Sequence, residues 1–436
     1  MDKSNHVSID MEQLETSLKG NLKTLHPLSE KCCIYRVLPR ERGLNKRLYT
    51  PQIISIGPIH YGREELKAME EYKRRYLNDF LQRTQVRMID LLLFIKHRET
   101  RLRNCYAETI ELESDEFVEM ILVDAVFIIE LLLRTSISCY EDNIRIVDRI
   151  LTKPWMIIDI ISDMFLLENQ LPMFILKDLY FQLSETAFCS HLYKGHSFVE
   201  LISGLWSWTN ICKFLLIKEE LVQKHFHRAE HFVDLLRLCL QPSVLHATDL
   251  KTLTTPSVTE LHQAGVQFKL SSSNHLLDIR FNDGILEIPN LKIVSETKVV
   301  LRNIQIFERL HCKTNYVNDY ITIMNYLVNT PKDVDLLIEN GVIENWMGNS
   351  EAVSSIFHKF IKEGRIFPWE FYYSGLVEDL NAYCKSPWHK WKANLKQNYF
   401  NSPWACISVT AAAILLFFTF IQTVCSIIQT VHSTRK

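Results

Sequence analysis

Apolar residues recur every three or four positions along most of the chain, which is the period of an α-helix. The clearest case runs from Glu64 to Thr84, where charged residues fill the positions between the apolar ones. The apolar positions are Leu66, Met69, Tyr72, Tyr76 and Phe80. The same spacing predicts helices at about 86–97, 115–134, 155–166, 171–183, 230–240, 297–311, 316–328, 332–340, 350–362 and 371–384. Pro331 is expected at the first position of one of these helices and Gly341 just beyond its end.

Two regions depart from this pattern. Between Ile34 and His60, three prolines predict an extended or looped chain, with Gln52 to Ile56 as a candidate short strand. Between Ser257 and Val300, the runs VQFKL, LLDIRF and ILEI have the composition of short strands. The turn sequence Asn282-Asp283-Gly284 separates the last two runs, which is typical of a β-hairpin. The predicted fold class is therefore mainly α with a small antiparallel β-sheet (α+β), the sheet lying around residues 266–295.

The last apolar stretch has no polar face. No Asp, Glu, Lys or Arg occurs from Gln397 to Thr434, and the apolar run from Trp404 to Ile428 exceeds the roughly 20 residues that cross a bilayer. We therefore expect a single C-terminal transmembrane helix rather than a buried core helix. The residues that we expect to form this anchor include Trp404, Ala412, Leu416, Phe418, Gln422 and Ile428.

Basic and aromatic residues flank this span. More positive charges precede it than follow it, so the positive-inside rule predicts that the large N-terminal part is cytosolic. The residues before the span should contact lipid headgroups, because lysines and tryptophans alternate there. They are Lys385, Trp388, Lys390, Trp391, Lys392 and Lys396. The sequence does not distinguish the plasma membrane from an endomembrane.

A second apolar run, Phe117 to Leu133, contains Glu119, Asp124 and Glu130. It is expected to be a soluble core helix, because a buried charge is costly in lipid.

These patterns divide the chain into five parts. The parts are a loosely ordered leader (1–30), a mainly helical soluble domain (31–384), a basic and aromatic juxtamembrane segment (385–403), the transmembrane helix (404–428) and a short tail (429–436).

The span also carries a pattern for self-association. Ser408 and Ala412 are small residues four positions apart, a spacing that lets two helices approach closely in lipid. Gln422 lies within the hydrocarbon, where an amide favours a partner across a helix interface. We expect a weak homodimer through the span. The alternative is a monomeric anchor whose threonines bond their own backbone.

Composition excludes several classes of protein. Lys and Arg total 49 and Asp and Glu total 51, so the net charge of −2 does not predict a nucleic-acid partner. The 11 cysteines follow no repeated spacing and are expected to be reduced. The motifs G-x-x-x-x-G-K-[ST], G-x-S-x-G and H-E-x-x-H do not occur, so no catalytic residue and no cofactor is assigned.

Three groups of residues are candidates for chemistry. His227 and His231 would share a helical face suited to a metal, although solvated imidazoles are the favoured interpretation, and no metal site is assigned. Asp159, Asp163 and Glu168 could form an acid–base pair, but structural roles are favoured, with Arg36 or Arg302 as partners. We expect Arg36 to pair with a buried carboxylate, Asp124 or Glu168. The basic run Lys73-Arg74-Arg75 is interpreted as a solvated helical face rather than a lipid or nucleic-acid contact.

Several runs occur in a characteristic order along the chain. They include Ile34-Tyr35-Arg36-Val37, SIGPIHYG (55–62), LKAMEEYKRRYL (66–77) and FLLENQLPMFIL (165–176). Together they resemble the plant domain-of-unknown-function 247 family over about residues 32–428, with Leu38-Pro39 where that family usually has Val-Pro. The resemblance implies a plant-specific, membrane-associated protein with no established enzymatic activity. Some members of the family are linked to pollen–pistil self-incompatibility in grasses.

The combined interpretation is a non-enzymatic, membrane-anchored interaction or signalling and recognition module. Its expected partners are membrane lipid and an unknown protein. Two alternatives remain: an enzyme with an unrecognised site in a helical cleft, and a carrier of an apolar ligand. An enzyme should bring polar groups together in one pocket, a carrier should enclose a large dry cavity, and an interaction module should expose an apolar patch.

Overall fold

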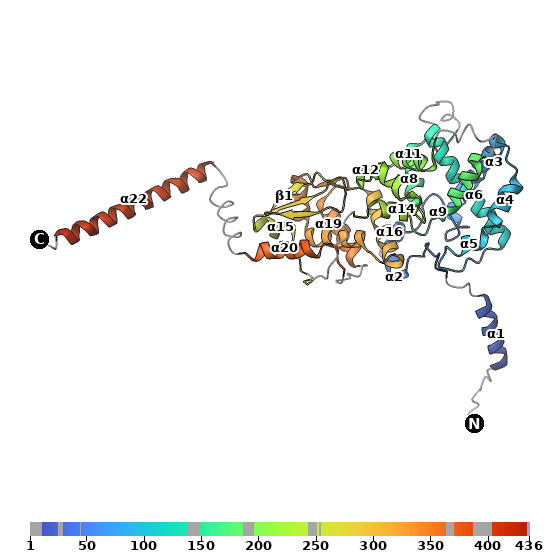
Figure 1. The fold of residues 1–436 in the computed structure, drawn as a ribbon, viewed down its shortest axis with the longest axis horizontal. Helices are drawn as coiled ribbons and strands as arrows, with labels where there is room; N and C mark the ends of the chain where they lie inside the picture. The colour runs from blue at the N-terminus through green and yellow to red at the C-terminus, as the bar shows by residue number, and fades with distance from the viewer. Residues whose placement is uncertain are drawn as a thin grey trace, which may run out of the picture. The chain divides into compact units, whose positions relative to one another are not determined.

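The computed structural model is mainly α-helical, with short strands gathered in small sheets (Figure 1). The structure describes residues 11–24, 29–43, 45–137, 148–185, 196–242, 251–252, 254–362, 370–386 and 403–433. The predicted fold class is confirmed in its main terms, and every predicted helix overlaps an observed one. The fold has two compact units. Unit 1 comprises residues 1–242 and 292–318, and unit 2 comprises residues 243–291 and 319–436.

Unit 1 is organised around helix α6 (Ser114–Ile137). Its first turn carries Asp115 and Glu116, which favour a helix N-terminus, and nearly every residue from Phe117 to Leu133 is buried. The prediction of a soluble core helix over this run is therefore confirmed. Helix α6 packs against α3 (Lys67–Thr84), α4 (Met88–Lys96), α9 (Met173–Glu185) and α11 (Phe198–Trp208).

Unit 1 also contains two longer helices, α1 and α16, and several short elements. Helix α1 (Met11–Thr24) forms within the predicted leader, and α16 (Ser295–His311) packs against α8, α12, α14 and η1. The short elements are α2 (Pro39–Arg42), η1 (Lys46–Leu48), η2 (Glu64–Leu66), α5 (Glu99–Arg103), α8 (Pro154–Met164), α12 (Ile211–Phe214), α13 (Glu219–Phe226) and α14 (Phe232–Cys239).

The segment from Cys33 to Gly62 in unit 1, named the extended segment, has little regular structure among its described residues apart from the short helices α2 and η1. The strand predicted at Gln52–Ile56 is wrong, because the N–H groups of Gln52, Ile53 and Ile54 donate to the carboxylate of Asp163 at 2.7–3.0 Å instead of to another strand. A glycine is required at position 57. Its φ is +73°, and an added Cβ would lie 2.6 Å from the carbonyl oxygen of Gln170.

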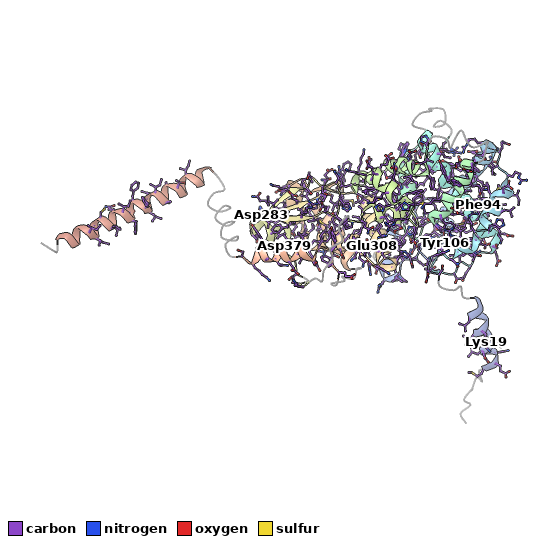
Figure 2. The ribbon with its side chains drawn as sticks, viewed as in Figure 1. Lys19, Phe94, Tyr106, Asp283, Glu308 and Asp379 are labelled. Atoms are coloured by element: carbon purple, nitrogen blue, oxygen red, sulfur yellow. The ribbon has the colours of Figure 1, made fainter. Side chains whose placement is uncertain are left out.

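Unit 2 contains a three-stranded sheet in the order β1-β3-β2. Strands β2 (Arg280–Asn282) and β3 (Ile285–Ile288) form the predicted antiparallel hairpin, and Asp283 (Figure 2) and Gly284 both have positive φ, as a tight two-residue turn requires. The expectation of a purely antiparallel sheet is wrong. Strand β1 (Gln267–Leu270) pairs parallel with β3, since the connection before β2 is long enough to bring the chain back in the opposite direction.

The other elements of unit 2 are mostly helices. Helix α18 (Pro331–Glu339) has Pro331 at its start, a capping box at Thr330, and Gly341 in the left-handed region just after its end, as predicted. The other elements are α15 (Val258–Gln263), β5 (Ile343–Asn345), α19 (Ser350–Lys362), α20 (Ser374–Lys385) and α22 (Pro403–Ser433). Strand β4 (Leu291–Ile293) and helix α17 (Tyr316–Leu327) cross the boundaries between the units.

Candidate functional site

The C-terminal helix α22 contains the predicted span. Thr410–Ile428 is long and apolar enough to cross a membrane, and no part of this stretch is buried in the structure. Leu416, Phe418 and Ile428 are exposed there, as are Ala412 and Gln422. Trp404 lies in the first turn of α22. The hydroxyls of Thr419 and Thr423 donate to carbonyls one turn earlier, each at 2.8 Å.

The juxtamembrane segment is described only at its start. Lys385 is the last residue of α20 and is exposed. The remaining candidates, Trp388, Lys390, Trp391, Lys392 and Lys396, lie outside the described residues. Their contact with lipid headgroups stays a prediction.

The histidine cluster does not form a shared helical face. His227 ends α13, whereas His231 begins α14, so the helical spacing of four does not apply. His231 is buried rather than solvated. Its Nε2 donates to the carbonyl of Cys33 at 3.0 Å, and its Nδ1 accepts the N–H of Asp234 at 3.2 Å. Burial lowers its pKa, so the ring is neutral near pH 7. No group of three potential metal ligands occurs within the described ranges.

The basic run on α3 is not a uniform solvated face. Arg74 and Arg75 are exposed, but Lys73 is completely buried and pairs with Asp124 of α6 and with Glu70. The Lys73 ammonium also donates to the carbonyl of Ser55 at 2.9 Å. Asp124 accepts the N–H of Gly57 at 2.7 Å, and burial raises the pKa of Asp124 to about 6. This buried pair therefore holds the extended segment against α3 and α6.

Glu168 anchors the same segment further along. It accepts the N–H of Val37 at 2.5 Å and pairs with Arg42 and with His60, whose Nε2 lies 2.9 Å away. Burial alone would raise the pKa of Glu168, but the bonds from His60 and Arg42 bring it below its usual value. Arg36 takes no part. It is half-exposed and pairs at 2.7 Å with Glu108, so the expectation that it pairs with Asp124 or Glu168 is wrong.

The other candidate carboxylates have similar structural bonds or lie at the surface. Burial raises the pKa of Asp163 to about 6, although its oxygens accept three backbone N–H groups of the extended segment. Asp159 is exposed. Glu130 pairs with Arg83 and Arg134. Arg302, also proposed as a partner, is buried against Glu41 and Tyr49, at 2.9 Å and 2.6 Å. The buried carboxylates Asp163, Glu130 and Glu41 therefore hold loops and helices in place.

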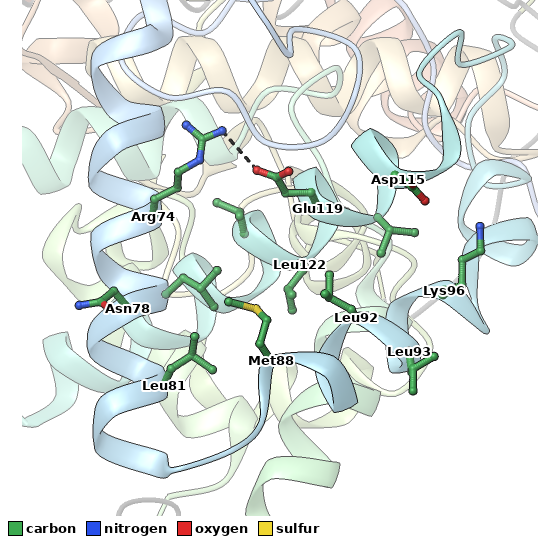
Figure 3. Close-up of a pocket in the computed structure, with 13 residues that line it drawn as sticks. Arg74, Asn78, Leu81, Met88, Leu92, Leu93, Lys96, Asp115, Glu119 and Leu122 are labelled. Atoms are coloured by element: carbon green, nitrogen blue, oxygen red, sulfur yellow. Dashed lines mark hydrogen bonds and ion pairs between the residues drawn. The ribbon is translucent and has the colours of Figure 1, made fainter.

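An apolar groove on unit 1 is the main surface feature that the sequence did not predict. Helices α3, α4 and α6 form its walls and enclose about 700 Å³ (Figure 3). Charged side chains gather along one end, where Arg74 pairs with Glu119, while Lys96 and Asp115 lie nearby (Figure 3). The apolar lining comprises Leu77, Leu81, Met88, Leu92, Leu93, Val118, Leu122 and Val123.

Helix α4 explains why this groove is open. Leu91, Phe94 and Ile95 are buried on its inner side, whereas Met88 and Leu93 on its outer side are 40% and 46% exposed. Most of its residues are apolar, which is more than one buried stripe needs. That excess was the signal in the sequence. It could have indicated a second apolar face, although not which helices would join it.

Two further cavities are less apolar. One of about 750 Å³ lies on unit 1 beside α9, where Lys177 donates to the carbonyl of Phe226 at 2.6 Å and burial lowers its pKa. The other, of about 690 Å³, lies on unit 2 beside α15 and is lined mostly by polar residues such as Thr254, Glu260 and Asn381. The α3–α4–α6 groove therefore offers the largest apolar lining of the three.

The fold and its surfaces define a mainly helical protein with one C-terminal apolar helix and an open apolar groove. The chain belongs to the plant domain-of-unknown-function 247 family, described as plant protein of unknown function, which it matches over residues 34–418. The predicted resemblance is confirmed.

Two relatives come from Arabidopsis thaliana. "UPF0481 protein At3g47200" is 27% identical over 441 residues, covering 92% of this chain and 87% of the relative. "Putative UPF0481 protein At3g02645" is 24% identical over 478 residues, covering 86% of each. No solved structure matches the chain.

Proposed function

We propose that the chain is a non-enzymatic interaction protein held at a membrane by α22, with the apolar groove of unit 1 contacting a polypeptide partner. The observation that carries the proposal is the exposed apolar stretch Thr410–Ile428. At 1.5 Å per residue it is about 28 Å long, close to the thickness of the hydrocarbon core. Such a stretch is unfavourable in water and favourable in lipid.

The interaction role is supported by the groove. An enzyme would need polar groups that converge on a substrate, and a carrier would need an enclosed apolar cavity. The groove has neither property, because its lining is mainly apolar and two of its lining residues, Met88 and Leu93, are partly exposed. An open apolar surface of this kind is typical of protein contacts. The partner is a protein that presents a complementary apolar face.

Orientation and assembly complete the proposal. Lysines before the span hold the large domain in the cytosol and contact anionic lipid there. The span also forms a weak homodimer. Thr419 and Thr423 already bond within their own helix, so the exposed Gln422 is the group that seeks a partner in lipid. Gln422→Leu together with Ala412→Leu should lower energy transfer between labelled copies of the span.

Membrane anchoring can be tested in plant cells with the full chain and a variant that lacks residues 404–436. The full chain should stay in the membrane pellet after alkaline carbonate washing, and the truncated chain should appear in the supernatant. Protease added to sealed, right-side-out vesicles should leave the large domain intact. A truncated chain that still resists carbonate would overturn the anchor, and digestion in sealed vesicles would reverse the orientation.

A further inference from the structure

Helix α1 is an amphipathic helix whose apolar side has no cover. Met11, Leu14, Leu18 and Leu22 are spaced by three, four and four residues, which places them within an arc of about 80° at 100° per residue. These four side chains are 42–68% exposed, so no described part of the chain packs over them. A free helix of 14 residues is marginal in water, and Gly20 weakens it further. The helix therefore needs a surface.

The groove of unit 1 matches this stripe in length and chemistry. Leu14 to Leu22 spans about 12 Å at 1.5 Å per residue. The lining positions on α4, from Met88 to Lys96, span the same eight residue steps. A helix that lies in a groove contacts it through side chains one turn apart, which is the spacing of Leu14, Leu18 and Leu22.

The chain between α1 and the body of unit 1 is long enough for docking. Cys33 is fixed beside Cys105, because the Cys33 N–H donates to the Cys105 carbonyl at 2.9 Å. Helix α5 precedes Cys105, and at its start Glu99 binds Lys96 at 3.0 Å and Ser114 at 2.6 Å. One short helix, about 10 Å at most, thus separates Cys105 from the charged end of the groove. Ser29 to Cys32 forms a turn, in which the Cys32 N–H donates to the Ser29 carbonyl at 3.1 Å. The five residue steps from Thr24 to Ser29 can span about 17 Å.

Charge sets the direction in which α1 would lie. The tether brings the C-terminal end of α1, which carries Lys19 and Lys23, to the end of the groove where α6 begins. An exposed acidic run occupies that place: Glu111, Glu113, Asp115 and Glu116. These four carboxylates make no ion pair with the described residues. Arg74 and Lys96 at the same end are already paired with Glu119 and Glu99, so the acidic run is the excess charge there. Opposite charges therefore meet when the tether is satisfied, and like charges would meet if the helix were reversed.

From these observations we infer that α1 docks into the α3–α4–α6 groove of its own chain and closes it to other proteins. Leu14, Leu18 and Leu22 enter the apolar lining, and the C-terminal end of α1 lies beside the start of α6. The inference goes beyond the proposed function, because it holds whether or not α22 lies in a membrane. An outside partner of the groove would have to displace α1, so the leader is an internal competitor for the interaction surface.

A photo-cross-linking residue tests this inference directly. Full-length protein with p-benzoyl-phenylalanine in place of Leu18 would be reconstituted at one copy per lipid nanodisc and irradiated. We expect a product of monomer mass whose cross-linked peptides fall within residues 74–96 or 115–123. The same residue in place of Gln13, which lies on the other side of α1, should give at least fivefold less of this product. Higher salt should lower the yield at position 18 about twofold.

A groove variant separates docking from chance proximity. Leu93→Glu should reduce the position-18 product at least fivefold, whereas Phe181→Glu, which adds the same charge at an exposed apolar residue of α9, should leave it unchanged. If Leu93→Glu lowers the melting temperature, Met88→Glu takes its place. Cross-links mainly to lipid, products that form only between two copies, or equal yields at positions 18 and 13 would each overturn the inference.

Discussion

Helices α6 and α22 are both long and strongly apolar, yet the first is buried and the second is exposed. Helix α6 is buried in unit 1 and carries Asp124 and Glu130, each paired with a basic group from the same unit. Helix α22 has exposed apolar side chains and no charged residue from Thr410 to Ile428. The comparison teaches that isolated charges, rather than the abundance of apolar residues, separate a core helix from a candidate membrane span. A charge in α6 is supported by a partner that the fold supplies, and lipid offers none.

The largest expected effect comes from breaking the charge pair of α6. Lys73→Met should lower the free energy of unfolding by about 3–5 kcal/mol, because it leaves Asp124 buried without its ion-pair partner. Asp124→Asn should cost less, because Lys73 keeps its contacts with Glu70 and the Ser55 carbonyl. The double variant Lys73→Met with Asp124→Asn should be more stable than the sum of the two single changes predicts. Urea denaturation of all three variants measures this coupling. Strict additivity would contradict a direct Lys73–Asp124 interaction.

A charge introduced into α22 should have nearly as large an effect on insertion. Leu416→Arg adds a cation near the middle of the apolar stretch, at a cost of about 2.5–3.5 kcal/mol. We expect a clear fall in the carbonate-resistant fraction. Ser433→Arg at the end of the helix is the matched control and should change little, since an arginine there reaches the headgroups. Equal effects of the two variants would argue against a membrane position for Leu416.

The pH dependence of stability should report the buried Asp163. Burial raises its pKa to about 6 in the folded protein, above the value of about 4 expected in the unfolded chain, so the folded state holds the proton more tightly. The stability of the wild type relative to Asp163→Asn should therefore fall by roughly 2–3 kcal/mol as the pH rises from 4 to 6, and stay level above 6. Urea titrations at several pH values measure the difference. A relative stability that rises over this interval would contradict the raised pKa.

The smallest effect is expected at the surface. Arg36→Ala removes a half-exposed ion pair with Glu108 and should change the free energy of unfolding by less than about 1 kcal/mol. Arg42→Ala, which removes a partner of the buried Glu168, should destabilise the protein much more. Thermal unfolding of the two variants decides the ranking. A larger loss for Arg36→Ala would place that residue in the buried network after all.

Sequence periodicity predicted helices such as α3 well, because a helix that buries one stripe repeats its apolar positions every three or four residues. It failed where the decisive contacts are distant in sequence. Lys73 looks like part of a basic surface run, and only the approach of Asp124, 51 residues away, makes it a core residue. The hairpin Arg280–Ile288 was predictable from its turn, whereas the parallel pairing of β1 depends on a long connection. Helices α11 and α13 were missed because their apolar positions are interrupted by glycine or charge.

The candidate sites also differ in whether they depend on consecutive residues or on residues that are distant in sequence. The apolar stretch of α22 is a property of consecutive residues, so the sequence alone predicted it. The groove is assembled from three helices, and its existence depends on which side of α4 the core leaves uncovered. Glu168 bonds to a backbone group, as its structural interpretation expected, but the segment that supplies this group was not predicted. Val37 lies 131 residues from Glu168, and Ile53 lies 110 residues from Asp163, so no local pattern reveals these contacts.

The contrast between the two helices can be measured in one insertion assay. Residues 403–433 and residues 114–137 would each be placed between two glycosylation acceptor sites in a host membrane protein and translated with microsomes. A segment that integrates leaves one site glycosylated, and a segment that passes through leaves both. We predict single glycosylation for most chains that carry α22 and double glycosylation for most chains that carry α6. Double glycosylation of the α22 chains would contradict the central claim that this helix is a membrane anchor.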